Sequence, residues 1–96
     1  MPDYKLSRLA DRDLSEIARY TIKHWSEHQA DDYFLGLHRL LSRLAQKPEI
    51  GIASDHISLG YLRYRFRSHM VFYKKTRQGI FIVRVLHGRM DFTRHL

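Results

Sequence analysis

The residues best suited to form a working surface lie at the end of the chain, after an apolar run at residues 80–86. This run contains one charge, Arg84, and a run of this kind predicts a strand buried on both faces. A buried arginine needs an acidic partner or a groove into which its guanidinium can point. Polar groups on a short tail after a rigid strand often form a functional surface. The tail that follows carries such groups in close succession: His87, Arg89, Met90, Asp91, Arg94 and His95.

Three groups in this tail are compatible with metal-free cleavage of a phosphodiester bond: His87, Arg89 and His95. In such a site one group accepts the proton of the 2′-hydroxyl, another protonates the leaving oxygen, and arginines stabilise the transition state. The alternative is that His87 ends a strand and the arginines are solvated. For His87 alone this simpler interpretation is favoured.

A row of arginines alternates with apolar residues, so Arg63, Arg65 and Arg67 are expected on one face of a strand. Aromatic side chains that stack on nucleic-acid bases should share that face with the charge. Tyr64 falls on the opposite face by alternation, so the pattern of a nucleic-acid platform is incomplete. An acidic or amphipathic peptide would bind the same arginines, and both types of partner stay open at this point.

The sequence predicts no metal site and no cofactor. His24 and His28 have the spacing that can chelate a metal on a helix, but an expected helix break near Glu27 separates them and no third ligand is evident. The chain has no cysteine, which excludes disulfides and thiolate sites. No nucleotide-binding glycine motif and no HExxH motif is present.

Length and composition indicate one small domain, residues 1–96, with 44% hydrophobic residues. No apolar stretch reaches the roughly 18 residues of a membrane span, and no signal peptide is evident, so we expect a soluble cytoplasmic protein. Residues 1–56 hold eight Lys/Arg and nine Asp/Glu, a net of −1, whereas residues 57–96 hold nine Lys/Arg and one acid, a net of +8. This one-sided charge favours an acidic partner over a merely solvated surface.

Hydrophobic periodicity predicts two helices after a short strand at residues 4–6. Apolar residues recur at spacings of three and four over residues 8–26 and again over residues 30–46. Ser7 is expected to cap the first helix. The short link between the helices predicts an antiparallel helical hairpin.

The rest of the chain predicts a sheet. A loop at residues 49–60 leads into three strands with tight turns, which indicates an antiparallel meander. The fold class is therefore α+β, with the order β-α-α-β-β-β and a short C-terminal tail. The hairpin is expected on one face of the sheet, against Leu62, Tyr64 and Phe66, with the arginine face open. The expected strands are residues 61–67, 69–75 and 80–87.

The apolar stripe of the second helix is wide, because adjacent large side chains spread it around the helix. One edge of the stripe could pack on the sheet while the other binds a partner. Burial of both edges inside the domain is equally compatible with the pattern. The candidates for a partner-binding helical face are Trp25, Phe34, Leu37 and Leu41.

Three segments resemble the ParE toxins of the RelE/ParE superfamily. They are YKLSRLADRDLSEIARYT near the N-terminus, GYLRYRFRSHMVFYKK in the middle and IVRVLHGRMDFTRHL at the end. The resemblance covers nearly the whole chain. The last segment is the most specific, because an apolar strand is followed by LH, then RMD and a closing RHL.

This resemblance implies the toxin half of a type II toxin–antitoxin system that stabilises plasmids or chromosomes. ParE-like toxins inhibit DNA gyrase, and a ParD-like antitoxin neutralises them in a hetero-oligomeric complex that contacts DNA through the antitoxin. The chain is then an inhibitor and not an enzyme. Trp25, Phe34, Leu37 and Leu41 become the face covered by the antitoxin. The residues implied in gyrase or antitoxin contact are Arg63, Arg65, Arg84, His87, Arg89, Met90, Asp91 and Arg94.

RelE-type toxins share the fold and cut mRNA on the ribosome, so they provide the alternative function. Their active sites use basic residues on the sheet and usually a tyrosine or histidine near the C-terminus. No tyrosine follows Tyr73 here, and the LHGRMD segment favours the gyrase inhibitor. A RelE-like endoribonuclease would use Arg63, Arg65, Arg84, His87 and His95.

Overall fold

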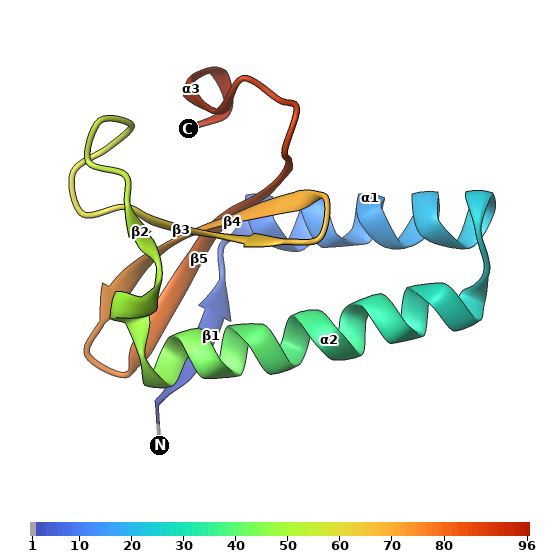
Figure 1. The fold of residues 1–96 in the computed structure, drawn as a ribbon, viewed down its shortest axis with the longest axis horizontal. Helices are drawn as coiled ribbons and strands as arrows, with labels where there is room; N and C mark the ends of the chain where they lie inside the picture. Colours follow the sequence, from blue (N-terminus) through green and yellow to red (C-terminus); the bar gives the residue numbers. More distant parts are fainter. Residues whose placement is uncertain (1) are drawn as a thin grey trace.

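A computed structural model describes residues 2–96 and has the predicted α+β architecture (Figure 1). Two antiparallel helices form the hairpin, and five strands form one sheet. No helix formed by residues 2–96 has the length and hydropathy that a membrane crossing requires. The elements are β1 Asp3–Leu6, α1 Arg8–His24, α2 Glu27–Gln46, a 3-10 turn Pro48–Ile50, β2 Ile52–Ala53, β3 Leu62–Phe66, β4 His69–Thr76, β5 Gly79–His87 and α3 Phe92–His95.

Serine caps set the start of both long helices. The Ser7 hydroxyl accepts the N–H of Ala10 at 2.9 Å, as predicted. The Ser26 hydroxyl accepts the N–H of Gln29 at 3.0 Å, so α2 begins at Glu27 and not at Ala30. The residues expected to link the helices therefore form the first turn of α2. The remaining link at Trp25 and Ser26 is very short and keeps the hairpin antiparallel.

The sheet has the order β1-β5-β4-β3-β2. The predicted meander of β3, β4 and β5 is confirmed by their antiparallel pairing. β1 runs parallel to β5 and pairs with it only from Gly79 to Ile82. β2 lies within the segment that was expected to be a loop, and it pairs with Leu62 and Arg63 of β3. Because β1 is so short, no strand formed by residues 2–96 pairs with the outer edge of the second half of β5.

The hairpin packs on one face of the sheet and forms the core there. Leu37 and Leu41 of α2 are 2% and 1% exposed, and they contact a cluster that includes Val71, Tyr73 and Ile82. Leu62, Tyr64 and Phe66 of β3 are partly buried against the same cluster, as the alternation predicted. Burial of this face accounts for most of the hydrophobic stabilisation of a domain this small.

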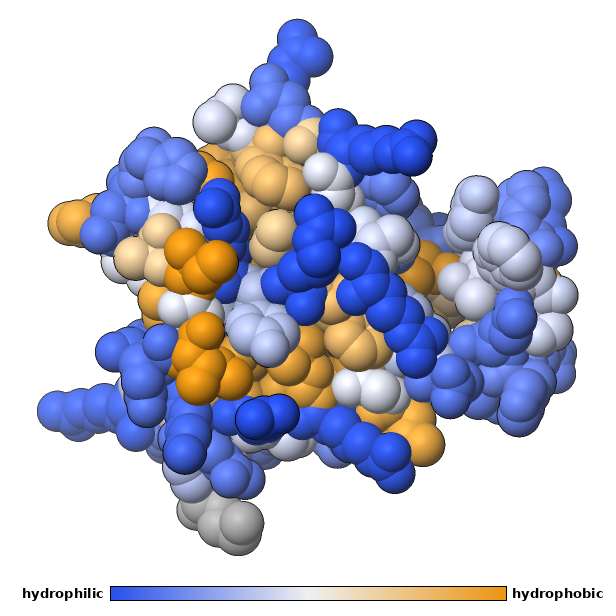
Figure 2. Space-filling model, viewed as in Figure 1, coloured by the Kyte–Doolittle hydropathy of each residue, from blue (hydrophilic) through white to orange (hydrophobic). Residues whose placement is uncertain are grey.

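The other face of the sheet is not fully open, contrary to the expectation from the sequence. Phe72 of β4 is completely buried because α3 folds over it, with the rings of Phe72 and Phe92 4.9 Å apart. Arg63 and Arg65 lie beside this cover, paired with Phe72 and Met70 of β4. Figure 2 shows hydrophobic side chains interspersed with strongly hydrophilic ones on one face of the molecule. On this face of the sheet, the apolar Phe72–Phe92 contact therefore has the basic side chains of Arg63 and Arg65 beside it.

Arg67 departs from the predicted arginine row. It occupies the β3–β4 turn with a φ of 53°, in the left-handed region. Its guanidinium lies 3.2 Å from the Asp32 carboxylate of α2 and stacks near the ring of Tyr33. The turn thus directs Arg67 toward the helices, whereas Arg63 and Arg65 stay on the strand.

Candidate functional site

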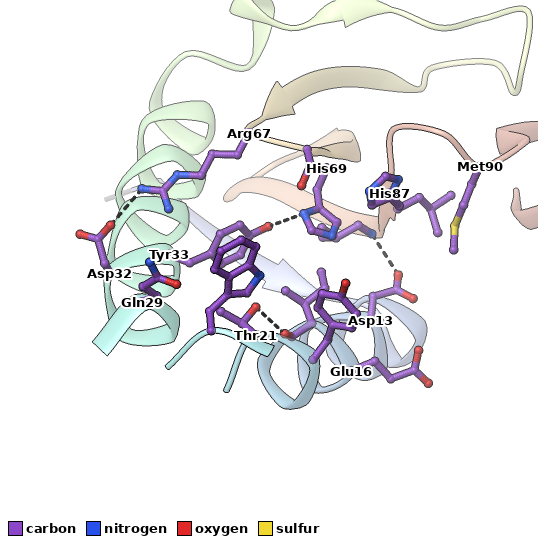
Figure 3. A pocket seen from close by; sticks show the side chains of 16 residues that line it. Asp13, Glu16, Thr21, Gln29, Asp32, Tyr33, Arg67, His69, His87 and Met90 are labelled. Atoms are coloured by element: carbon purple, nitrogen blue, oxygen red, sulfur yellow. Dashed lines mark hydrogen bonds and ion pairs between the residues drawn. The ribbon is translucent and has the colours of Figure 1, made fainter. Parts of the chain in front are cut away.

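A groove of about 830 Å³ separates the connected ends of α1 and α2 from the β3–β4 turn and the end of β5 (Figure 3). Helical side chains form one wall, and strand residues form the other. Trp25, at the hairpin tip, is 69% exposed and stands at the groove. The lining residues are Asp13, Glu16, Ile17, Tyr20, Thr21, Trp25, Gln29, Asp32, Tyr33, Arg67, Ser68, His69, Val85, Leu86, His87 and Met90.

A chain of aromatic groups lies along the groove. The Tyr33 hydroxyl is 3.0 Å from Nδ1 of His69 (Figure 3). His69 and His87 are direct cross-strand partners on β4 and β5, with their rings 5.6 Å apart and nearly perpendicular. Burial raises the pKa of Tyr33 to about 12, so its hydroxyl keeps its proton near neutral pH and can donate to His69.

The environment of His69 disfavours its charged form. Burial first, and the neighbouring His87 second, lower the pKa of His69 below its ordinary value. The imidazole is therefore neutral at physiological pH and accepts a hydrogen bond as a neutral base would. Tyr33 and the neutral His69 thus line a groove that also holds the charged residues Asp13, Glu16, Asp32 and Arg67.

The lowered pKa of His69 predicts a pH dependence of stability. An unfolded chain binds the His69 proton more readily than the folded one, so the free energy of unfolding should fall as pH drops from about 7 to 5. Urea titrations at several pH values will measure this loss. His69→Gln should flatten the profile, whereas His56→Gln, a change at an exposed loop histidine, should leave it unchanged. If the pH profile of His69→Gln were identical to that of the parent, the assignment of this pH dependence to His69 would be contradicted.

The second polar cluster is an ion pair at the edge of β5. Asp13 of α1 is 9% exposed, and its carboxylate accepts hydrogen bonds from Nε and Nη2 of Arg84 at 2.8 Å each. The same carboxylate accepts the N–H of Val85 at 3.0 Å, on the strand edge that β1 leaves unpaired. Hydrogen bonding to Asp13 raises the pKa of Arg84. The partner required by the buried arginine is therefore Asp13.

The predicted site residues divide among three places. His87 and Met90 line the groove, and Arg84 is held against Asp13 behind it. Arg63 and Arg65 lie on the opposite face of the sheet. In the tail, Arg89 and Arg94 are exposed, and Asp91 caps α3 by accepting the N–H of Thr93 at 3.1 Å.

Several of the groups proposed for RNA cleavage make contacts with other residues. Arg84 bonds the backbone carbonyl of His95 at 3.0 Å, while the His95 side chain is exposed. His87 uses its Nδ1 to accept the N–H of Arg89 at 3.2 Å. Among residues 2–96, no hydrogen bond or ring contact joins the two imidazoles.

The proposed helical face is corrected by burial. Leu37 and Leu41 belong to the core and cannot contact a partner in this fold, because they point at the sheet. Phe34 is half-buried against the same cluster, so Trp25 is the one exposed member of the predicted set. Exposed apolar side chains on the helices outside that set include Leu9, Tyr20, Ile22 and Leu35.

Sequence reasoning missed Asp13, Tyr33 and His69 as site residues. Asp13 had a detectable signal, because it lies three residues after Ala10 and four before Ile17, on the buried stripe of α1. An acid on an apolar stripe and an arginine in an apolar strand are expected to pair. Tyr33 and His69 had no such signal. A tyrosine in an apolar stripe resembles any core aromatic, and the contact of His69 with Tyr33 joins two segments that are far apart in the sequence.

Comparisons with known proteins agree with this fold. Residues 4–92 match the family described as the ParE toxin of the type II toxin–antitoxin system parDE. The chain is 43% identical over 94 residues to Toxin ParE1 of Mycobacterium tuberculosis strain H37Rv, covering 97% of this chain and 96% of that protein. It is 36% identical over 96 residues to Toxin ParE1 of Caulobacter vibrioides, covering 100% of this chain and 99% of the relative.

A solved structure shares the fold at lower sequence identity. It is titled the chromosomal ParDE TA system from P. aeruginosa, and the alignment has a TM-score of 0.75 at 17% identity, covering 91% of this chain and 96% of that chain. The resemblance seen in the three sequence segments is therefore confirmed over nearly the whole length. The chain belongs to the ParE toxin family of type II toxin–antitoxin systems.

Proposed function

We propose that this toxin inhibits DNA gyrase in the cytoplasm and that a ParD-like antitoxin neutralises it. Membership of the ParE family carries the proposal, since the match spans residues 4–92. The inhibitor needs no catalytic acid–base pair. Arg84, one of the candidate residues of a ribonuclease site, has its guanidinium engaged by Asp13, which is compatible with such an inhibitor.

The two partners would use different surfaces. We propose that gyrase contacts the arginines of the sheet and the tail, where the basic excess of residues 57–96 lies. Arg63, Arg65, Arg89 and Arg94 are the candidates there. The antitoxin would place an amphipathic segment in the groove, which offers Trp25 and a row of aromatic groups, and would make the only contact with DNA. An acidic segment would be attracted by the same basic field.

Trp25 is expected to dominate antitoxin binding. It is 69% exposed in the free toxin, and burial of a large aromatic side chain in an interface commonly contributes most of the affinity. Trp25→Ala should weaken binding of the antitoxin by about 30-fold or more, measured by isothermal titration calorimetry. Leu35→Ala is the matched control, because Leu35 is exposed on α2 and does not line the groove. Equal affinities for the two variants would contradict this assignment.

One experiment separates the gyrase inhibitor from the ribonuclease. Purified toxin is incubated with gyrase and supercoiled plasmid, the protein is denatured, and linear DNA is sought. In parallel, the toxin is added to a translating extract and mRNA ends are mapped. Linear DNA with intact mRNA supports the proposal. Cut mRNA with unchanged plasmid would overturn it and indicate a RelE-like activity.

A further inference from the structure

We propose that Asp13 of α1 is a positioning residue for the C-terminal tail, acting through Arg84 as a two-sided clamp. This proposal rests on the proposed function only in assigning toxicity to the tail. The positioning itself follows from hydrogen bonds of the described residues. The clamp connects Asp13, in the wall of the groove, to the C-terminal tail on the other side of β5.

The clamp begins with a carboxylate whose hydrogen-bonding capacity is largely used. One oxygen of Asp13 accepts from Nη2 of Arg84, and the other accepts from Nε of Arg84 and from the N–H of Val85. Bidentate pairing of this kind fixes the plane of the guanidinium as well as its position. Asp13 therefore determines the direction in which the remaining nitrogen of Arg84 points.

That remaining nitrogen holds the tail. Nη1 of Arg84 donates to the backbone carbonyl of His95 at 3.0 Å. Edge-to-face packing of Phe92 on Phe72 also helps to fix α3 on the sheet. Because α3 spans only Phe92–His95, its own hydrogen bonds stabilise it little. The position of the tail thus depends on these two external contacts.

Replacing Arg84 with lysine tests whether the tail is positioned by the forked guanidinium or merely by a positive charge paired with Asp13. In Arg84→Lys the ammonium can still pair with Asp13, but it lacks the forked geometry that reaches the carboxylate and the His95 carbonyl together. Trypsin can cut after Arg89 and Arg94, both exposed in the tail, so cleavage reports tail opening. Cleavage should be about tenfold faster in Arg84→Lys than in the parent, the effect of losing one charge-assisted hydrogen bond.

Asp13→Asn tests the same clamp from the helix. It keeps the size of the side chain but removes the charge that orients Arg84, so tail cleavage should also rise by about tenfold. Asp11→Asn is the matched control, because it neutralises an exposed carboxylate on the same helix that makes no hydrogen bond or ion pair with Asp13 or Arg84 among the described residues. Its cleavage rate should equal that of the parent. Thermal melting curves of all variants will check that the domain stays folded.

The outcomes are decided by two separate readouts. Parental cleavage rates in both Arg84→Lys and Asp13→Asn would overturn the proposal. Faster cleavage with the fold retained supports it, whether or not the parent protein yields linear DNA with gyrase. If the parent does yield linear DNA, both variants should yield less of it at equal protein concentration, by the factor by which the fraction of correctly positioned tails falls. Absence of linear DNA with the parent would count against the gyrase proposal alone.

Discussion

Removal of residues 91–96 is expected to reduce formation of linear DNA by gyrase about a hundredfold or more, in line with loss of the central residues of an interface. The deleted segment holds one arginine and one aspartate, so the side-chain charge of the chain is retained. The expected loss would therefore reflect specific contacts of the tail and not its share of the basic field. The gyrase assay on supercoiled plasmid measures it.

The truncated domain should stay folded but become less stable. Deletion uncovers Phe72, which is completely buried under Phe92 in the full chain, and should cost about 2 kcal/mol. Circular dichroism will distinguish a folded variant from an unfolded one. As a control for charge, Lys74→Gln with Lys75→Gln lowers the positive charge and leaves the tail intact. A folded truncation that still yields linear DNA would contradict the role of the tail.

Gly79→Ala is expected to have the largest effect on stability. Gly79 has a φ of 144°, and a Cβ at this position would overlap the backbone oxygen of Asp3 on β1. The overlapping atoms belong to the backbone of a paired strand and cannot move aside without breaking the β1–β5 ladder. We expect a loss of about 3 kcal/mol, which lowers the Tm of a domain this size by roughly 12–24 °C.

Gly60→Ala is the matched control for this prediction. Gly60 also has a positive φ, of 84°, but apart from its chain neighbours no atom of the described residues lies within 4 Å of a Cβ built there. Its substitution should cost only the backbone strain, about 1 kcal/mol. Scanning calorimetry on both variants separates strain from overlap. If Gly60→Ala and Gly79→Ala lost equal amounts of stability, the overlap with β1 would contribute nothing to the cost at Gly79.

Local patterns predicted most of the fold, because helices and hairpins depend on neighbours in the sequence. The caps at Ser7 and the meander of three strands follow from such patterns. The start of α2 was misplaced because Ser26 was not identified as its cap. β1 was expected as a strand, but its parallel position beside β5 depends on a pairing between the two ends of the chain. β2 has only two residues, too few for a periodic pattern.

By itself, the sequence determined the α+β class, the family resemblance and the concentration of positive charge in the second part of the chain. Only the tertiary structure decided which polar groups meet. Asp13 and Arg84 lie 71 residues apart and pair because α1 covers the edge of β5 that β1 leaves free. Likewise, the burial of Leu37 and Leu41 and the cover over Phe72 depend on how the layers pack. Such contacts arise from packing between distant segments, which periodicity along one segment does not encode.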